Sequence, residues 1–267
     1  MKNIPHDYYL KYLDPKVHIE TLEFHAKGNY TLHDAFKNTT CLHTLDDAQL
    51  STLTGNELRF YPDMDLSIVI EEPSDFGDEL GRNESCESFT HDPIDFSTIK
   101  NLVKPLLSKN SDSHKRGYPS GGALYPIEIF ICSLMRSTNN WPFPDRFLHL
   151  LPHSGKFEVM QKKLTSEEIE QAILCTPANI GTPSVAIIYT AYLPKTLFKY
   201  RYRGYRLALM EAGSLYMLLE LRAKQLGLRC RLWSAYTDTL LNKAMGLNPA
   251  LFSPLCVHFI GAAHESV

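Results

Sequence analysis

The sequence predicts a mixed fold of helices and strands, of the α+β or α/β class. Segments with the character of strands alternate with segments whose apolar residues have helical spacing. One long segment, from Tyr202 to Leu226, is apolar on nearly every face, which is typical of a helix buried at the centre of a fold or across a dimer interface. With 267 residues, 44% of them hydrophobic, the chain can bury a substantial core.

The first third of the chain is predicted to be an extension of that domain. Residues 1 to about 70 have the pattern of short helices followed by two strands, LRFY and LSIVI. The segment from Glu71 to Asp95 is acidic, with Arg82 as its single arginine or lysine, and its glycine, proline and serine are typical of a solvated loop or linker. We therefore assign residues 1–90 to an N-terminal extension with an acidic linker, suited to supporting a partner or a dimer, and residues 91–267 to the main domain.

The main domain begins with a helix candidate at residues 95–109, which is interrupted near Pro105 because proline lacks a backbone donor. Strands are expected at residues 126–135, 146–153, 183–193 and 254–262. Between the second and third of these strands, Thr165 or Ser166 can cap the start of a helix, and glutamates follow in its first turn. The long helix at 202–226 precedes the last strand.

Composition argues against several classes of function. The formal net charge of −3 disfavours general affinity for nucleic acid or for an anionic membrane. No apolar run approaches the length of a membrane span, and the N-terminus lacks the apolar core of a signal peptide, so a soluble, cytoplasmic protein is expected. The six cysteines form no CxxC pair and are expected to be reduced thiols packed as small apolar groups. The eleven histidines form no HExxH motif, and no metal site is expected.

The most unusual segment is FKYRYRGYR, residues 198–206, which places four cations and four aromatic residues around one glycine. Arginine does not lose its proton in proteins, so Arg201, Arg203 and Arg206 would surround Lys199 with fixed positive charge and favour its neutral form. From these residues alone the segment could be an activated lysine, a clamp for phosphate, a partner for the linker acids or a nucleic-acid patch. The acidic net charge and the apolar helix that follows disfavour the last alternative.

A second segment with the character of a site is RGYPSGGALYPIE, residues 116–128. Gly121 and Gly122 permit a close backbone approach to a ligand, Ser120 adds a hydroxyl, and Arg116 adds a fork that suits phosphate. The alternative is a tight turn held by its two prolines. Short glycine-rich loops are weak motifs, so spacing alone favours the turn.

Three segments in this order, YPSGGALYPIE, LFKYRYRGYRLALMEAGS and LGLRCRLWSAYTD, together resemble a known family. They are similar to the FMN-dependent azoline dehydrogenases, the thiazole- and oxazole-forming oxidases in the streptolysin-type branch of the nitroreductase superfamily, and in particular to the oxidase subunits of microcin B-type synthetases. The resemblance covers most of the chain, including His25–Asn29, and is strongest from Arg116 to Asp238. It implies a nitroreductase-like, FMN-binding α+β fold and a homodimer with flavin at the subunit interface.

The resemblance also implies roles for individual residues. Ser120, Gly121 and Gly122 would line the flavin with Arg116 nearby, and the backbone of Trp233 and Ser234 would approach the isoalloxazine ring. Lys199 and Tyr200 match the pair that is regarded as catalytic in the family. Arg203 and Arg206 could hold the FMN phosphate or tune Lys199, and the sequence leaves both roles open. Met217–Leu218 stands where related enzymes often carry Gln-Asn, which would make the interface there more apolar.

The implied reaction is the oxidation of peptide thiazolines and oxazolines to thiazoles and oxazoles, during maturation of a ribosomally made peptide of the microcin type. Lys199 would remove the acidified alpha proton, and Tyr200 would orient the substrate or relay the proton, with the reverse assignment open. Dioxygen would be the final acceptor. The implied partners are the precursor peptide and the cyclodehydratase subunits of a synthetase complex.

Two other functions stay open at this point. One is an NAD(P)H-dependent, nitroreductase-type reductase that acts on a small molecule. The other is a non-catalytic subunit that serves as the scaffold of a peptide-modifying complex.

Overall fold

The computed structural model describes residues 6–29, 46, 48–49, 81–109, 113–135, 140–174 and 179–263. Residues 1–31 and 82–267 form one compact unit, and residues 32–81 form a second. The two strands expected at LRFY and LSIVI, and the start of the acidic linker, lie outside the described residues. The role of residues 1–90 as a supporting extension stays a prediction.

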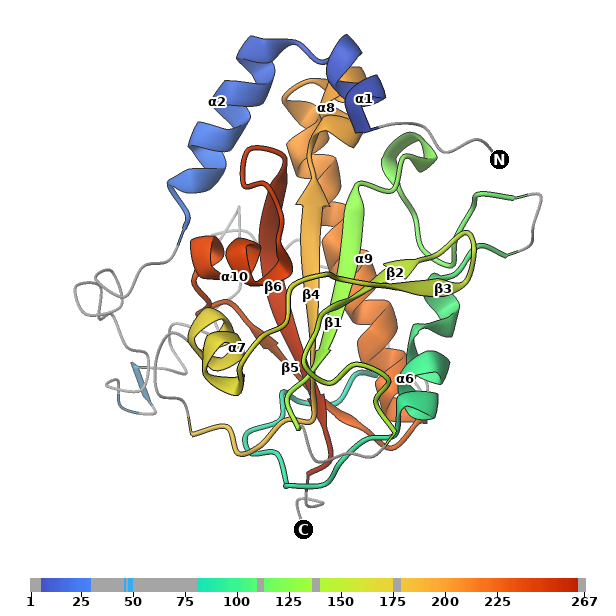
Figure 1. Cartoon of the computed structure of the whole chain (residues 1–267), viewed down its shortest axis with the longest axis vertical. Helices are drawn as coiled ribbons and strands as arrows, with labels where there is room; N and C mark the ends of the chain where they lie inside the picture. Colours follow the sequence, from blue (N-terminus) through green and yellow to red (C-terminus); the bar gives the residue numbers. More distant parts are fainter. Residues whose placement is uncertain are drawn as a thin grey trace, which may run out of the picture. The chain divides into compact units, whose positions relative to one another are not determined.

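The centre of the larger unit is an antiparallel sheet (Figure 1). Its described strands are β1 (Ile127–Ser133), β2 (Leu148–Leu151), β3 (Lys156–Val159), β4 (Val185–Tyr192), β5 (Arg229–Trp233) and β6 (Phe252–Gly261). They lie in the order β3-β2-β1-β4-β6-β5, and each neighbouring pair is antiparallel. The fold is therefore α+β, and the alternative of a parallel α/β sheet was wrong.

Both faces of the sheet are covered, which explains why β4 reads VAIIYTAY and is buried along its whole length. Alternate residues of a strand point to opposite faces, so Ile187 and Tyr189 enter one core cluster and Ala186 and Ile188 the other. Figure 1 shows α9 (Arg203–Gln225) behind the sheet, and α7 (Ser166–Ile173) and α10 (Asp238–Met245) in front of it. The two clusters of buried side chains fill the spaces on these two sides.

The remaining described helices are α1 (His6–Tyr12), α2 (Pro15–Ala26), α6 (Phe96–Val103) and α8 (Pro194–Tyr200). The break expected near Pro105 is confirmed, because α6 gives way there to a 3-10 turn at Lys104–Leu106. The capped start of α7 is confirmed too. Thr165 and Glu168 form a capping box, in which each side chain accepts the backbone N–H of the other residue.

The long helix α9 matches its expected bounds within one residue at each end. One face packs on the sheet through the buried residues Ala212, Leu215 and Leu219. On another face Leu209 is 43% and Met210 is 68% exposed. The helix is thus packed into the core but open on one face within one chain, so the expectation that it is buried on every side is corrected. Its place at a dimer interface stays a prediction.

The described cysteines, Cys86, Cys132, Cys230 and Cys256, are free and buried, as expected for small apolar groups. Among the described helices, none combines the length and the apolar composition that crossing a membrane requires.

Candidate active site

The glycine-rich segment at residues 116–128 and the cationic segment at residues 198–206 lie against each other in the fold. Gly122 has a φ of +64°, and a Cβ atom built on it would lie 2.5 Å from Oη of Tyr200 and 3.0 Å from Nζ of Lys199. We call residues 116–125 the glycine loop. Its backbone at Gly122 therefore lies directly against the ends of the predicted catalytic side chains. A side chain at this position would displace the end of Tyr200 and crowd the end of Lys199.

Strand pairing explains this meeting of residues that lie far apart in sequence. β1 and β4 are antiparallel neighbours, with Ile127 opposite Ala191. The glycine loop enters β1 at the end of the sheet where the chain leaves β4. α8 starts there at Pro194, whose ring suits the first position of a helix, and it ends on Lys199 and Tyr200. In Figure 1, α8 lies at this end of the sheet beside α1 and α2.

Backbone strain marks the same place. Within the described parts of the chain, the non-glycine residues with positive φ are Ala123 at 53°, Tyr125 at 51° and Arg201 at 50°. The first two belong to the glycine loop, and the third directly follows Tyr200. Such conformations cost about 1–3 kcal/mol each and persist only where the surrounding structure holds them.

Arg116 is held inside the glycine loop by aromatic residues. Its backbone N–H donates to Oη of Tyr125 at 2.9 Å, and its Nη1 donates to Oη of Tyr118 at 2.7 Å. The guanidinium carbon lies 4.3 Å from the centre of the Tyr125 ring, which favours a cation. Nε of Arg116 is buried and makes no hydrogen bond with the described residues. The loop thus contains a fixed positive charge with a donor still available.

The predicted cationic surroundings of Lys199 are found only in part. Arg201 forms an ion pair with Asp14, at 3.0 Å from Nη1 to Oδ2, so a carboxylate counters its charge. Arg203 and Arg206 are exposed and line, with Tyr202, an open hollow of about 300 Å³. The side chain of Lys199 is itself exposed in the chain. Within the chain, Lys199 is therefore reached by solvent, and only the arginines are left to favour its neutral form.

Contacts from α2 to the turn between α8 and α9 were missed by the sequence analysis, which assigned no chemistry to the first 70 residues. Besides the Asp14–Arg201 pair, the hydroxyl of Tyr202 donates to the Glu20 carboxylate. Nδ1 of His25 lies 3.1 Å from Oη of Tyr205. The similarity of His25–Asn29 to the azoline dehydrogenases was the signal that could have indicated this contact.

Glu211 was also missed. It lies on α9, is 2% exposed, and accepts the backbone N–H of Ile127 on Oε1 at 3.2 Å. Burial raises the pKa of this carboxyl to about 7, against the opposing effect of a hydrogen bond from Ser120. A single acid in the apolar run LALMEAGS was the available signal.

Trp233 and Ser234 are not joined to the other predicted residues by a contact that the structure describes. The indole N–H of Trp233 donates to the carbonyl oxygens of Ile173 and Ala235, and the ring packs with the core cluster on the α7 side of the sheet. Ser234 is exposed. The expected approach of this backbone to a flavin stays a prediction.

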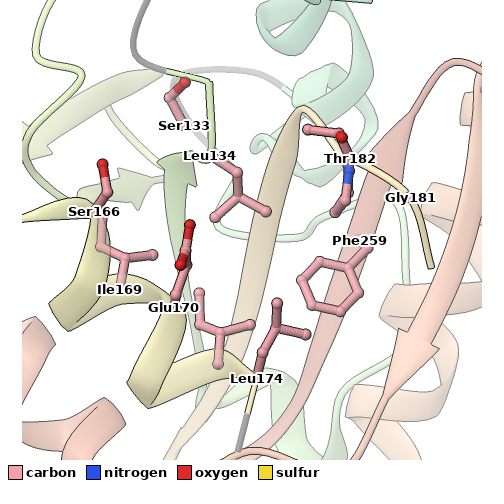
Figure 2. A pocket seen from close by; sticks show the side chains of 11 residues that line it. Ser133, Leu134, Ser166, Ile169, Glu170, Leu174, Gly181, Thr182 and Phe259 are labelled. Carbon is pink, nitrogen blue, oxygen red and sulfur yellow. The ribbon is translucent and has the colours of Figure 1, made fainter. Parts of the chain in front are cut away.

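A separate pocket lies on the α7 side of the sheet (Figure 2). It has a volume of about 110 Å³, and Ser133, Ser166, Glu170, Thr182 and Phe259 are among its lining residues. The described residues that line it include none of the predicted site residues, so we place the candidate site at the glycine loop and not here.

Comparison with known proteins shows the family to which the chain belongs. The model of the nitroreductase family matches residues 82–262, and the chain belongs to this family. The resemblance stated from the sequence is thus confirmed at the level of the family.

Within this family, the chain is similar to a protein that processes microcin B17. The chain is 36% identical over 256 residues to the microcin B17-processing protein McbC of Escherichia coli, covering 95% of this chain and 93% of the relative. A chain of the E. coli microcin synthetase McbBCD complex with truncated pro-MccB17 bound has a TM-score of 0.86 at 32% identity, over 98% of this chain and 99% of that one. A nitroreductase-type protein of Ralstonia eutropha, with a TM-score of 0.58 at 15% identity over 70% of this chain and 82% of its own, shares the fold alone.

Proposed function

We propose that this protein is an FMN-dependent oxidoreductase that converts thiazolines and oxazolines of a ribosomally made precursor peptide into thiazoles and oxazoles. The observation that carries the proposal is the direct contact of the Gly122 backbone with the ends of Lys199 and Tyr200. It occurs in a chain that matches a microcin B17-processing protein over 95% of its length.

The residues at the site fit a flavin nucleotide. Gly121 and Gly122 present backbone without side chains, and the buried Nε of Arg116 has no partner among the described residues. Arg203 and Arg206, in the open hollow beside α8, supply positive charge for a phosphate. Arg116, Ser120, Gly121 and Gly122 would hold the isoalloxazine end of the cofactor, with the backbone of Trp233 and Ser234 near it. The bound cofactor would supply a hydride acceptor for the beta carbon of the azoline ring.

The protein itself moves the proton. The alpha carbon of an azoline lies between an imine and a carbonyl, so its proton is acidic enough for a positioned base. Lys199 is our choice for that base. Tyr200, whose ring centre lies 5.1 Å from Nζ of Lys199, would orient the ring or relay the proton. Loss of one proton and one hydride gives the aromatic azole, and dioxygen takes the electrons in the end.

We also propose the assembly in which this chemistry occurs. The relative of known structure is part of a synthetase complex with a precursor bound, which supports cyclodehydratase subunits and a precursor peptide as partners of this chain. A homodimer would cover the exposed Leu209 and Met210 of α9. Residues 1–90 would support these contacts.

An absorbance spectrum of the purified protein, recorded without oxygen before and after addition of an azoline peptide, tests the proposal. Flavin absorbance that disappears only when the peptide is added, with formation of the azole, is the expected result. Loss of that absorbance with NAD(P)H and no response to peptide would indicate a small-molecule reductase instead. A colourless protein that binds no added FMN would indicate a scaffold subunit.

A further inference from the structure

Glu211 is a buried acid that the proposed chemistry does not use. It lies on α9 between the apolar residues Met210 and Ala212. Its Oε1 accepts the N–H of Ile127, the first residue of β1, at 3.2 Å. Its Oε2 is buried and has no hydrogen-bond partner among the described protein groups at the distances that define one. A carboxyl is costly to bury, so a position like this needs a reason.

Ser120 connects this carboxyl to the glycine loop. The Ser120 hydroxyl oxygen accepts the N–H of Tyr125 at 2.9 Å. That leaves the hydroxyl proton available to Glu211, and the nearby Ser120 lowers the pKa of the Glu211 carboxyl against the effect of burial. Tyr125 in turn accepts the backbone N–H of Arg116. Hydrogen bonds thus join Ser120 to Tyr125 and Tyr125 to Arg116, and Glu211 holds the chain just after this loop at the Ile127 amide.

We infer that Glu211 is a positioning residue, which holds the Arg116–Tyr125 loop in its cofactor-binding conformation through the Ser120 hydroxyl and the Ile127 amide. The inference rests on the proposed function for the identity of the cofactor. Without this anchor, the Ile127 amide loses its side-chain acceptor, two residues after the strained Tyr125. The contact of Gly122 with Lys199 and Tyr200 then loses its support.

Hydrogen bonding, not charge, carries this role. The charged groups that act on the carboxyl are Arg116 and Lys195, which favour its ionised form, while burial favours the neutral form. Tyr118 and Glu128 lie in the same charge network. A glutamine at this position keeps one acceptor oxygen, for the Ile127 amide, whereas leucine keeps the volume and removes both oxygens.

The test compares Glu211→Gln with Glu211→Leu. We expect Glu211→Leu to weaken FMN binding about tenfold or more, because the buried Ile127 amide loses its acceptor. It should also speed hydrogen exchange at the Tyr125 and Ile127 amides. Glu211→Gln should stay within about threefold of the wild type in FMN affinity. Glu220 is the matched control, since it is also buried on α9 but pairs with Arg82. Glu220→Leu should leave exchange at these two amides unchanged.

Glu211→Leu with unchanged FMN affinity and unchanged exchange would overturn the inference, and so would Glu211→Gln as damaging as Glu211→Leu. If Glu211→Leu does not fold, Ser120→Ala decides, because it removes one hydroxyl and little volume. The readout is the Ile127 amide, which Glu211 accepts and Ser120 does not. Unchanged exchange there in that variant overturns the proposed connection, and faster exchange supports it. If the wild type binds no FMN, the proposed cofactor is wrong, while the exchange measurements still test Glu211.

Discussion

Asp14 and Arg201 join the start of one helix to the end of another. The Asp14 carboxylate accepts the N–H groups of Lys16 and Val17, and so caps α2. Its other oxygen lies 3.0 Å from Nη1 of Arg201, the strained residue that follows Tyr200. Because Arg201 has this counter-ion, Arg203 and Arg206 are the arginines of the cationic segment that are left for an anionic ligand or for Lys199.

Replacement of Gly122 by alanine should abolish azole formation. A Cβ at this position collides with Tyr200 and Lys199, and the positive φ adds a cost of about 1–3 kcal/mol. Azoline oxidation and urea unfolding measure the two effects. Gly227→Ala is the control, since Gly227 has a φ of +70° with nothing within 4 Å of its Cβ position. It should lose similar stability and keep activity, and equal loss of activity in both variants would contradict the role of the contact.

Removal of the Lys199 amine should slow azole formation and leave FMN binding intact. Lys199→Ala is expected to keep FMN and to lower the rate of azole formation about 10²–10⁴-fold, the usual contribution of a positioned base. Single-turnover bleaching of the flavin by an azoline peptide measures that step directly. Lys163→Ala, at an exposed position in the loop before α7, is the control. Wild-type oxidation by Lys199→Ala would shift the assignment to Tyr200.

Variants of Arg203 and Arg206 can show whether these arginines bind the FMN phosphate or shift the pH at which Lys199 acts. We expect Arg206→Ala and Arg203→Ala to weaken FMN binding, because both line the hollow beside α8, and the loss should shrink as salt is added. Titration of the apoprotein with FMN at low and high salt measures this effect. An unchanged FMN affinity with a displaced pH–rate profile would show instead that the arginines act on Lys199.

Glu211 predicts a distinct dependence of stability on pH. Its pKa is about 7 in the folded chain and 4.5 for the free group, so the folded state holds a proton that the unfolded state has lost. The free energy of unfolding should therefore fall as pH rises from about 4.5 to 7 and then level off, by on the order of 3 kcal/mol for this group. Glu211→Gln should lack this part of the dependence in urea unfolding at pH values across the range. An identical profile for both proteins would contradict the raised pKa.

A charged residue on the open face of α9 should prevent dimerisation. Met210 is the more exposed of the two apolar residues there, and Met210→Lys places a charge where the proposed interface excludes water. Sedimentation of the two proteins gives the oligomeric state. Leu240→Lys on α10, where an apolar residue is 37% exposed, is the control and should leave it unchanged. A wild-type monomer would remove the homodimer from the proposal.

The sequence predicted those parts of the fold whose signals are local. The apolar run of β4, the long helix α9 and the capped start of α7 are examples, since periodicity and capping lie within a few residues. Short elements such as α8 and β5 were not predicted, because about five to seven residues give too little periodicity to recognise.

Prediction of the site had the same limit. The glycine loop and the Lys199–Tyr200 pair came from motifs and resemblance, and strand pairing then brought them together. The contacts of Asp14 and Glu20 with the start of α9, and the anchor at Glu211, join residues that are distant in sequence. No local pattern contains such contacts. The predicted approach of the Trp233 and Ser234 backbone to a flavin came from the resemblance alone, and it stays a prediction.

The close approach of Gly122 to Tyr200 and Lys199 has a practical consequence for anyone who recombines such enzymes. The loop and the end of α8 form complementary halves of one surface, so a chimera that takes the loop from one parent and the helix from another would join halves shaped for different neighbours. The two segments should be exchanged as a pair, and a library that varies either one alone should yield mostly inactive chains.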